Sequence, residues 1–412
     1  MTKIFPISTE TSCQLKWSWS TLYLNTGVTR SCHRTAESVL SPENFEDFHN
    51  TALKQSDRAS MLNGQWPEHS CGYCRSIEQA GGVSDRIRQL SVPYTVPPEL
   101  EADPGAVVVS PTLLEVFFNN TCNMGCLYCF PEVSSVIDAE NKKFGEFRQG
   151  GVHLVPANNQ YQTLVPLFWK WYETNFSTLS RLHVLGGEPF YQKEFDELLT
   201  MIEKTPSPNC ELNIVSNLKV SKSKLAAIVA RFKSLLARKH LKRVDITCSI
   251  DCWGPQQEYV RWGMDMTQWE ENFKFLCEQK WLTLNINQTI SPLTIKTMPE
   301  LLRRLAVWRE TKKIGHWFSG VDPGPDFMKV NVLGGDIFAD DFAEILSLMP
   351  ERDQEDSASK AYMQGIIKQS ASTGPDTKQI RDLLVYLDEK DRRRGTDWTQ
   401  LFPWLVEFKK VV

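Results

Sequence analysis

Three cysteines on one short segment are the residues best placed to do chemistry. Cys122, Cys126 and Cys129 have the spacing Cys-x3-Cys-x2-Cys and follow an apolar, strand-like run at 114–118. Thiolates are the usual protein ligands of iron–sulfur clusters, and an electron carrier closes its four-iron cluster with four cysteines. Three thiolates on one loop can bind three irons of such a cluster and leave the fourth open. An open iron is a place where a small molecule can bind and be activated.

A zinc site and three buried core cysteines are the simpler interpretations of this triplet. Structural zinc takes four nitrogen or sulfur ligands, and this segment supplies three thiolates with no histidine nearby. Attachment of a c-type haem would need a histidine directly after the Cys-x-x-Cys pair, but Phe130 stands there. The cluster with one open iron is therefore the favoured interpretation.

A second group of cysteines lies in the first hundred residues. An alternating run at 17–25 predicts one strand of a hairpin, and a segment at 42–62 predicts a helix that brings the chain back toward it. The spacing fits an iron–sulfur cluster and a structural zinc ion equally well, because four thiolates form a complete set for either. The four cysteines of this group are Cys13, Cys32, Cys71 and Cys74.

Composition limits the possible partners and compartments. The chain has 412 residues, enough for two or three domains, and 46 Lys and Arg against 50 Asp and Glu give a net charge of −4. This balance argues against a dedicated nucleic-acid or membrane surface, and no run approaches the length of a membrane span. No secretory apolar region is present, and seven of the 11 cysteines lie in the first 129 residues, where metal-like spacing is concentrated. We therefore expect a soluble, cytoplasmic protein.

Strands and helices are predicted to alternate from residue 107 to about residue 335, the pattern of a parallel α/β fold. In β/α barrels the chemistry gathers at the C-terminal ends of the strands. The predicted strands are 114–118, 182–185, 212–216, 244–249, 282–289 and 328–332, and the predicted helices are 164–175, 193–204, 222–239, 267–279 and 299–310.

Several polar motifs fall at these predicted strand ends. The second strand is followed by a Gly-Gly-Glu-Pro segment, and paired glycines allow a backbone to approach a ligand closely. By itself this segment is more typical of an ordinary turn. An arginine twelve residues beyond the end of the fourth strand can pair bidentately with a carboxylate or lie on a helix surface. The residues concerned are Gly186, Gly187, Glu188, Pro189, Ser216, Asn217, Ser249, Asp251 and Arg261.

The cysteine triplet and the Gly-Gly-Glu-Pro segment together resemble the radical S-adenosylmethionine (SAM) superfamily. The resemblance implies an open six-stranded, partial (β/α)6 barrel and a [4Fe-4S] cluster whose open iron binds SAM. Reduction of that cluster cleaves SAM to a 5′-deoxyadenosyl radical. It also implies that Gly186–Pro189 contact the SAM amino group, Ser249 and Arg261 its carboxylate, Asp251 the ribose and Tyr128 the adenine. Cys252 stands where relatives often have glycine.

The N-terminal cysteines follow the pattern Cys-x13-Gly-x4-Cys and Cys-x-x-Cys, which resembles the auxiliary-cluster modules of twitch and SPASM radical SAM enzymes. This implies a second [4Fe-4S] cluster, although such modules usually follow the barrel and this one precedes it. We expect a small α+β auxiliary module at 1–106, the barrel at 107–335 and a helical C-terminal extension at 336–412.

Three further segments carry no assigned chemistry. The basic helix predicted at 219–243 offers a surface to an acidic partner, but a solvated helix face is the favoured interpretation. The tail predicts helices at 340–349 and 378–394, with a small, polar and mobile stretch at 357–373 between them. Cys248 and Cys252 lie near the expected barrel mouth, where small core residues are favoured over substrate-facing thiols.

The expected function is a radical SAM enzyme supplied with electrons by a flavodoxin- or ferredoxin-type reductant. It would remove hydrogen from a peptide, a sugar or nucleotide, or a small metabolite. A net oxidation, with the auxiliary cluster as electron acceptor, is favoured over a radical isomerisation or epimerisation. The alternative from a different class is an iron–sulfur carrier or zinc-stapled scaffold without SAM chemistry, which should close both of its metal sites with four ligands.

Overall fold

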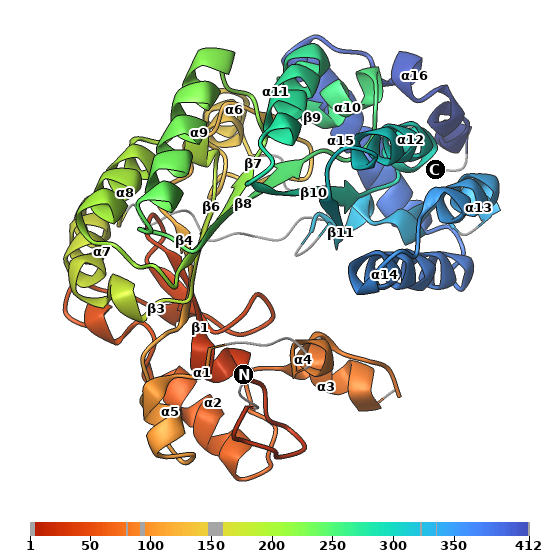
Figure 1. Ribbon diagram of the computed structural model, residues 1–412. Coiled ribbons are helices and arrows are strands. Elements are labelled where there is room, and N and C mark those ends of the chain that lie inside the picture. Colours follow the sequence, from red (N-terminus) through yellow and green to blue (C-terminus); the bar gives the residue numbers. More distant parts are fainter. Residues whose placement is uncertain are drawn as a thin grey trace. The chain divides into compact units, whose positions relative to one another are not determined.

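The computed structural model describes residues 5–79, 81–90, 95–146, 160–321, 324–334 and 336–410. It shows a mixed α/β protein with many parallel strands and many helices (Figure 1). The chain forms two compact units. The first contains residues 1–120, 157–214 and 229–244, and the second contains residues 121–156, 215–228 and 245–412. The three segments expected from the sequence follow other boundaries and stay a prediction.

The first unit is built on a sheet with the strand order β3-β2-β1-β4-β6-β7. The pairs β1–β4, β4–β6 and β6–β7 are parallel, whereas β1–β2 and β2–β3 are antiparallel. The strands are β1 (Trp19–Tyr23), β2 (Val28–Arg30), β3 (Ser38–Val39), β4 (Leu113–Phe117), β6 (Arg181–Leu185) and β7 (Glu211–Ser216).

The N-terminal hairpin extends this sheet, because β1 pairs in parallel with β4 from Trp19 opposite Leu113 to Tyr23 opposite Phe117. The expected strand at 17–25 is shorter than predicted. Its first residues belong to a one-turn helix, α1 (Leu15–Ser18), which buries Trp17 completely.

Seven α-helices in the described residues belong to the first unit. Helix α7 packs on the end of β4 through aromatic rings. The ring centre of Phe118 lies 5.3 Å from the ring centres of both Phe168 and Trp169. The helices are α1, α2 (Ala52–Leu62), α3 (Gly72–Gln79), α4 (Asp85–Leu90), α5 (Pro98–Ala102), α7 (Tyr161–Asn175) and α8 (Lys193–Lys204). Helix α9 (Lys222–Ala237) belongs to both units.

The second unit contains three parallel strands in the order β8-β10-β11 and a small antiparallel pair, β5–β9. The strands are β5 (Gly125–Cys126), β8 (Arg243–Ser249), β9 (Arg261–Trp262), β10 (Thr283–Ile290) and β11 (Ile314–Gly320). The helices are α6 (Ser135–Phe144), α10 (Pro255–Val260), α11 (Met266–Glu278), α12 (Met298–Arg309), α13 (Ala339–Leu348), α14 (Gln354–Ala371), α15 (Thr377–Arg394) and α16 (Trp398–Leu401).

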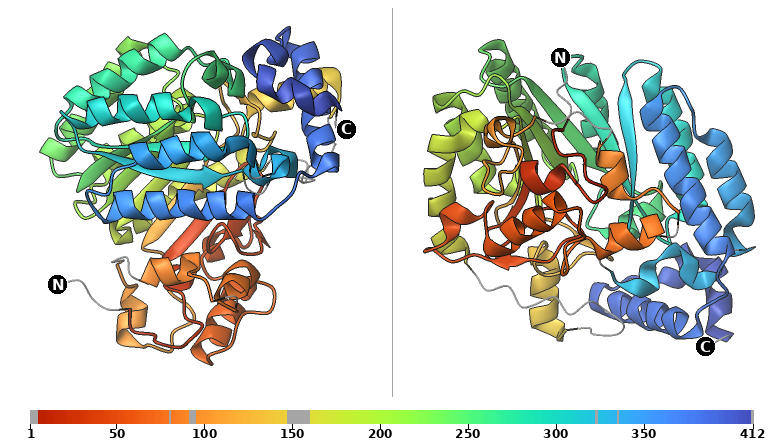
Figure 2. Two further views of the ribbon diagram at one scale, coloured as in Figure 1. Left: turned by 90° about the vertical axis from the view of Figure 1, so that its right-hand side faces the viewer. Right: turned by 90° about the horizontal axis from the view of Figure 1, so that it is seen from below.

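The C-terminal helices of this unit share one apolar core with the end of β10. Helix α14 lies alongside β11, and α13 packs on both α12 and α14 (Figures 1 and 2). Ile290, Met298, Ile345, Met363 and Leu383 are buried in this core. The C-terminal extension is therefore packed into the second unit.

Two expectations about this region were wrong. The segment at 328–332 is not a strand but lies in two 3-10 helices, Asp326–Met328 and Val330–Leu333. A short apolar run does not distinguish strand from helix by its periodicity. A strand that the sequence did not predict, β11, precedes this segment; its two glycines weaken its strand signal, but its seven residues all pair with β10.

The stretch at 357–373, predicted to be mobile, is almost entirely the helix α14. Asp353 caps this helix by accepting hydrogen bonds from the backbone N–H groups of Glu355 and Asp356. Two of its serines, Ser359 and Ser370, are buried, and Ser359 donates to the backbone carbonyl of His316 on β11. The sequence did not predict this buried face, because its residues are mostly small and polar.

None of the helices in the described residues is long and apolar enough to cross a membrane.

We predict that Leu383→Ala lowers the free energy of unfolding of the second unit by about 2–5 kcal/mol, because it leaves a cavity in the shared core. Leu383 is fully buried on α15. Val385, two residues further along the same helix, is 37% exposed, so Val385→Ala should cost about 0.5 kcal/mol or less. Chemical denaturation of both variants measures the difference. Equal costs would show that the tail does not share this core.

Candidate functional site

The cysteine triplet lies on a loop at 121–130, here called the cysteine loop, which is anchored by a short β-pair. Gly125 lies opposite Trp262 and Cys126 opposite Arg261 where β5 pairs with β9. The backbone N–H of Leu127 donates to the carbonyl of Val260 at 2.9 Å, which continues this pairing. The loop is thus held by backbone hydrogen bonds on both sides of Cys126.

The three thiols of this loop lie within one another's electrostatic field. Burial raises the pKa of the Cys129 thiol, and the neighbouring Cys126 and Cys122 raise it further. Burial also raises the pKa of Cys126, but Arg261 and Arg394 oppose this rise because each favours the thiolate. The Nη1 atom of Arg261 lies 4.0 Å from the Cys126 sulfur. The middle cysteine of the triplet therefore lies beside two cations.

A fully buried carboxylate, Asp251, organises the residues beside this loop. It binds Arg261 bidentately, with Nε–Oδ2 and Nη2–Oδ1 distances of 2.9 Å each. The Tyr128 hydroxyl donates to Oδ2 at 2.6 Å, and the backbone N–H of Thr289 on β10 donates to Oδ1 at 2.8 Å. The Arg261 guanidinium also lies 5.5 Å from the centre of the Tyr128 ring. Asp251 thereby joins the cysteine loop, β9 and β10.

This pairing changes what Arg261 and Asp251 have available for a ligand. The sequence predicted contacts with the SAM carboxylate for Arg261 and with the ribose for Asp251. In the structure the two residues hold each other, and Arg261 directs its remaining nitrogen toward Cys126. The Tyr128 hydroxyl is occupied as well, since it donates to Asp251.

The turn after β7 contacts the first cysteine of the loop. The side-chain amide of Asn217 lies 4.0 Å from the Cys122 sulfur and donates to Oδ1 of Asn123 at 3.0 Å. Ser216 is buried and accepts a hydrogen bond from the backbone N–H of Leu218. The structure thus brings Asn217 to the predicted cluster site and gives Ser216 a role within its own turn.

The remaining predicted residues of β8 and its following turn are buried. Ser249 is 7% exposed, and Cys248 and Cys252 are fully buried. Gln257 accepts hydrogen bonds from the backbone N–H groups of Asp251 and Cys252, which fixes the turn after β8.

The Gly-Gly-Glu-Pro segment forms a tight turn in the first unit. Gly186 and Gly187 have φ values of +87° and +54°, in the region that favours glycine. A Cβ on Gly186 would lie 2.5 Å from Cδ1 of Phe117, so close packing on β4 also requires glycine there. Glu188 is buried and caps the Pro189–Tyr191 turn by accepting from the backbone N–H of Phe190.

The four N-terminal cysteines come together in the first unit. Cys13 and Cys71 belong to one small apolar core, against which Cys32 packs. Burial is the main cause that raises the pKa of both Cys13 and Cys71 to about 12, and the neighbouring Cys32 contributes to both rises. Cys74 contributes in the same way to the raised pKa of Cys71. Cys71 itself has a φ of +66°, a strained conformation for this residue type that is often found at functional positions.

A buried lysine accompanies these four cysteines. Lys16 follows Cys13 by one helical turn, is 2% exposed and forms an ion pair with Asp57. Its positive charge acts on the thiols of Cys13, Cys32 and Cys71, since it opposes the rise of their pKa values. A thiolate-ligated metal group here would have a cation beside it.

The described residues contain no group of three or more His, Cys, Asp and Glu side chains that could hold a metal ion. Both predicted cluster sites therefore rest on sequence spacing and on the mutual electrostatic influence of their thiols. The donor chemistry still fits an anionic iron–sulfur cluster at the cysteine loop, because three neighbouring thiols and adjacent buried cations occur together there.

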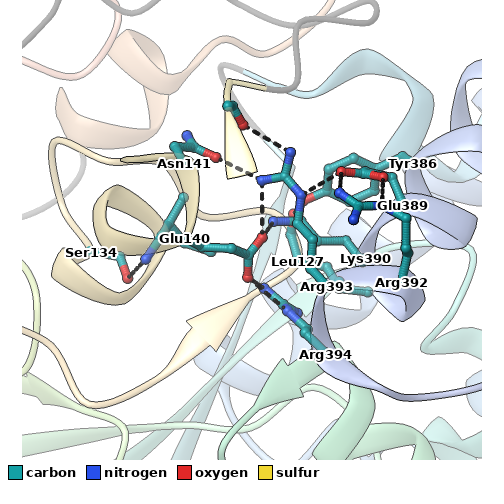
Figure 3. A network of polar contacts seen from close by, with 12 residues as sticks. Leu127, Ser134, Glu140, Asn141, Tyr386, Glu389, Lys390, Arg392, Arg393 and Arg394 are labelled. Atoms are coloured by element: carbon teal, nitrogen blue, oxygen red, sulfur yellow. Dashed lines mark hydrogen bonds and ion pairs between the residues drawn. The ribbon is translucent and has the colours of Figure 1, made fainter. Parts of the chain in front are cut away.

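The end of the C-terminal helix α15 is part of this site (Figure 3). The Tyr386 hydroxyl donates to the backbone carbonyl of Leu127 in the cysteine loop. Arg394 lies 4.9 Å from the centre of the Trp262 ring, and a Cβ on Gly125 would lie 3.2 Å from its Nη2 atom. Glycine at position 125 therefore makes room for Arg394 beside Cys126.

The cations of α15 are held by one carboxylate on α6, the helix that follows the cysteine loop. Glu140 accepts from Lys390, and Arg394 Nε donates to its Oε2 at 2.9 Å. Arg393 lies 3.6 Å from its Oε1 and also pairs with Glu389. Burial disfavours the charged form of Glu140, but Lys390 and Arg394 outweigh it and lower the pKa.

Positive charge outnumbers negative charge in this buried network. The side chains of Lys390, Arg393 and Arg394 are each no more than 4% exposed, whereas Glu140 and the less buried Glu389 are the carboxylates that pair with them. Burial and the nearby Arg394 lower the pKa of Lys390 to about 8. An anionic cluster on the adjacent loop would offset this excess charge.

Sequence reasoning missed the residues that reach the loop from far along the chain. Glu140, Tyr386 and Arg394 belong to no motif around the cysteines. The run Asp391-Arg392-Arg393-Arg394 was expected to pack on the barrel or the auxiliary module and was assigned no chemistry. The signal that was present is the Gly395 C-cap in the left-handed conformation, which marks the end of a helix but not its partner.

Comparisons with known proteins add little. No protein-family model matches the chain, and no curated protein does. A crystal structure of Streptococcus suis SuiB is similar at 14% identity and a TM-score of 0.39, over 86% of this chain and 69% of that chain. SuiB bound to the precursor peptide SuiA is similar at 14% identity and a TM-score of 0.36, over 73% and 61%.

We predict that Glu140→Gln destabilises the second unit by about 3–5 kcal/mol, because it leaves three buried cations with too little negative charge. The matched control is Asp138→Asn on the same helix, which removes a 31%-exposed partner of Lys142 and should cost about 1 kcal/mol or less. Chemical denaturation at neutral pH measures both values.

The same variant should change the pH dependence of stability. The pKa of Glu140 is lowered in the folded protein, so its contribution is present above the ordinary glutamate pKa and is lost as pH falls through the lowered value. Unfolding followed from pH 7 into the acid range should therefore show a shallower loss of stability for Glu140→Gln. Parallel curves would contradict the role assigned to this carboxylate.

Proposed function

We propose that this protein is a radical SAM enzyme whose cysteine loop holds a [4Fe-4S] cluster through Cys122, Cys126 and Cys129. The observation that carries the proposal is the Cys-x3-Cys-x2-Cys loop, whose thiols influence one another and whose buried Cys126 lies beside Arg261 and Arg394. When bound, such a cluster supplies the one-electron cleavage of SAM to a 5′-deoxyadenosyl radical.

The residues of the second unit orient this loop. The Asp251–Arg261 pair fixes Tyr128 through its hydroxyl and presents a guanidinium to the Cys126 sulfur. Asn217 approaches the Cys122 sulfur from the turn after β7. We propose that the backbone of this turn and the ring of Tyr128 contact SAM, together with Ser216 and Ser249. For the Gly186–Pro189 turn of the first unit, contact with SAM stays a prediction from the sequence.

We further propose that Cys13, Cys32, Cys71 and Cys74 bind an auxiliary [4Fe-4S] cluster in a twitch-like module. Four thiolates from one buried group can close every iron, and Lys16 places a positive charge beside them. A structural zinc ion is the competing occupant, since four thiolates suit it equally well.

The favoured reaction is a net oxidation of the substrate. Removal of a hydrogen atom leaves an unpaired electron, and a closed auxiliary cluster is a suitable receiver for that electron. A radical isomerase or epimerase needs no such receiver and is the second candidate. The substrate classes remain a peptide, a sugar or nucleotide, and a small metabolite. All 11 cysteines are free of disulfide bonds, which supports a reducing, cytoplasmic location.

Replacing all three loop cysteines by alanine tests the proposal. The triple variant Cys122→Ala, Cys126→Ala and Cys129→Ala should lose about half of the iron and all formation of 5′-deoxyadenosine, because only the auxiliary cluster remains. Iron analysis and an anaerobic assay with dithionite measure both losses against the unaltered protein. A closed electron carrier or zinc scaffold would form no 5′-deoxyadenosine even before substitution.

The direction of the chemistry has its own test once a substrate is found by metabolite profiling. We expect a product lighter by two hydrogens, with one 5′-deoxyadenosine formed per product, because SAM is consumed as the oxidant. High-resolution mass spectrometry of product and nucleoside measures both quantities. A product isomeric with the substrate, or SAM regenerated in each turnover, would assign the isomerase mechanism instead.

A further inference from the structure

A long basic stretch begins directly beside the cysteine loop. Between residues 212 and 244 the sequence contains no Asp or Glu, although the whole chain has a net charge of −4. The basic residues of the stretch are Lys219, Lys222, Lys224, Arg231, Lys233, Arg238, Lys239, Lys242 and Arg243. Its first three lysines belong to the second unit, as does the cysteine loop.

Lys219 and the cysteine loop hold each other by reciprocal hydrogen bonds. Lys219 Nζ donates to the backbone carbonyl of Asn123 at 3.0 Å, and Asn123 Nδ2 donates to the carbonyl of Lys219 at 2.6 Å. Asn217, two residues before Lys219, lies 4.0 Å from the Cys122 sulfur. The surface that starts at Lys219 is therefore directly connected to the first predicted cluster ligand.

The turn that presents these lysines is held in a fixed and strained conformation. Leu218 is fully buried and has a φ of +56°, which is unusual for a bulky residue. Asn272 on α11 stabilises it by donating to the carbonyls of Leu218 and Val220 at 3.0 and 2.8 Å. The lysines that follow thus project from a rigid base.

Lys222 and Lys224 are not explained by the stability of the fold. Both are exposed in the first turn of α9, where the helix dipole disfavours positive charge. Within the described part of the chain, neither lysine forms an ion pair, whereas Arg231 further along the helix pairs with Asp196 and Glu203. Unpaired cations at an unfavourable position suggest a partner outside the chain.

We propose that the surface formed by Lys219, Lys222 and Lys224 docks an acidic one-electron carrier protein, such as a flavodoxin, which delivers electrons to the cysteine loop. The inference rests on the proposed function, because it requires a cluster at that loop. In the step, the reduced carrier loses one electron and the cluster gains it, and no covalent bond changes. Opposite charges on the two proteins raise the rate of their encounter.

Charge reversal at the two exposed lysines tests this docking surface. The double variant Lys222→Glu with Lys224→Glu should lower 5′-deoxyadenosine formation supported by photoreduced flavodoxin by about tenfold or more at low ionic strength. The rate supported by dithionite should stay within about twofold, because this small reductant needs no docking. The difference in rate between the unaltered protein and the double variant should become smaller as salt is added, because salt screens the attraction between the unaltered protein and flavodoxin.

A matched control carries the same change of net charge elsewhere on the second unit. Lys378→Glu with Arg381→Glu alters two exposed cations of α15 and should leave the flavodoxin-supported rate unchanged. An equal loss in this control, or no loss in the lysine variant, would overturn the proposal. Loss of the dithionite-supported rate in the lysine variant would also overturn it, because the lysines would then act on the cluster itself.

The two proposals fail in different ways. If the unaltered protein forms no 5′-deoxyadenosine with dithionite, the radical SAM function and the docking surface both fall. If dithionite supports the reaction and flavodoxin acts equally on the lysine variant, only the docking surface falls. Binding of single-stranded RNA that is lost in the lysine variant, with an unchanged flavodoxin rate, would assign the surface to nucleic acid instead.

Discussion

The buried carboxylate of Asp251 is the point on which the geometry of the candidate site depends. It is fully buried and accepts from Arg261, Tyr128 and the backbone of Thr289, so that its charge is paired and its oxygens are occupied. A buried ion pair that loses one partner typically costs about 3–5 kcal/mol. The cysteine loop, β9 and β10 each supply a donor to this one carboxylate. Moving any of them away would break the pairing at that cost in free energy, so their relative positions are fixed.

The pairing of Arg261 with Asp251 suits holding the cysteine loop better than binding a ligand. An arginine already engaged bidentately has little freedom to follow a small molecule, but it presents a steady positive charge to Cys126 at 4.0 Å. A cluster ligated by thiolates is anionic, and the positive charges of Arg261 and Arg394 favour the thiolate form of Cys126. The arrangement therefore suits assembly and reduction of a cluster more directly than it suits recognition of a carboxylate.

Much of the fold could be predicted from the sequence, because local patterns decide it. The strands β4, β6, β7, β8 and β10 and the helices α7, α8, α9, α11 and α12 agree with the predicted elements to within three residues at each end. Strand β11 could not be predicted this way, since its glycines weaken the pattern and its pairing with β10 stabilises it. Helix α14 was missed for a related reason: its buried face is small and polar, and it fits against β11.

In the candidate site, too, local features could be predicted from the sequence and distant contacts could not. Cysteine spacing is local, so both sets of candidate ligands could be named from the sequence, and the structure places the thiols of each set within electrostatic reach of one another. The partners of those thiols are not local. Glu140 and Arg394 meet across 254 positions, and nothing in a run of arginines indicates whether it faces solvent or a buried carboxylate.

That distant contact also links the docking of the C-terminal helix to the binding of a cluster at the cysteine loop. Cations at the end of α15 are buried against Glu140, and burial and the nearby Arg394 lower the pKa of Lys390 more than Glu140 raises it. A cluster bound to the neighbouring cysteine loop would add negative charge where it is lacking, so cluster binding and docking of the C-terminal helix must stabilise each other. The last helical turn of α15 would then complete the electrostatic environment of the proposed cluster.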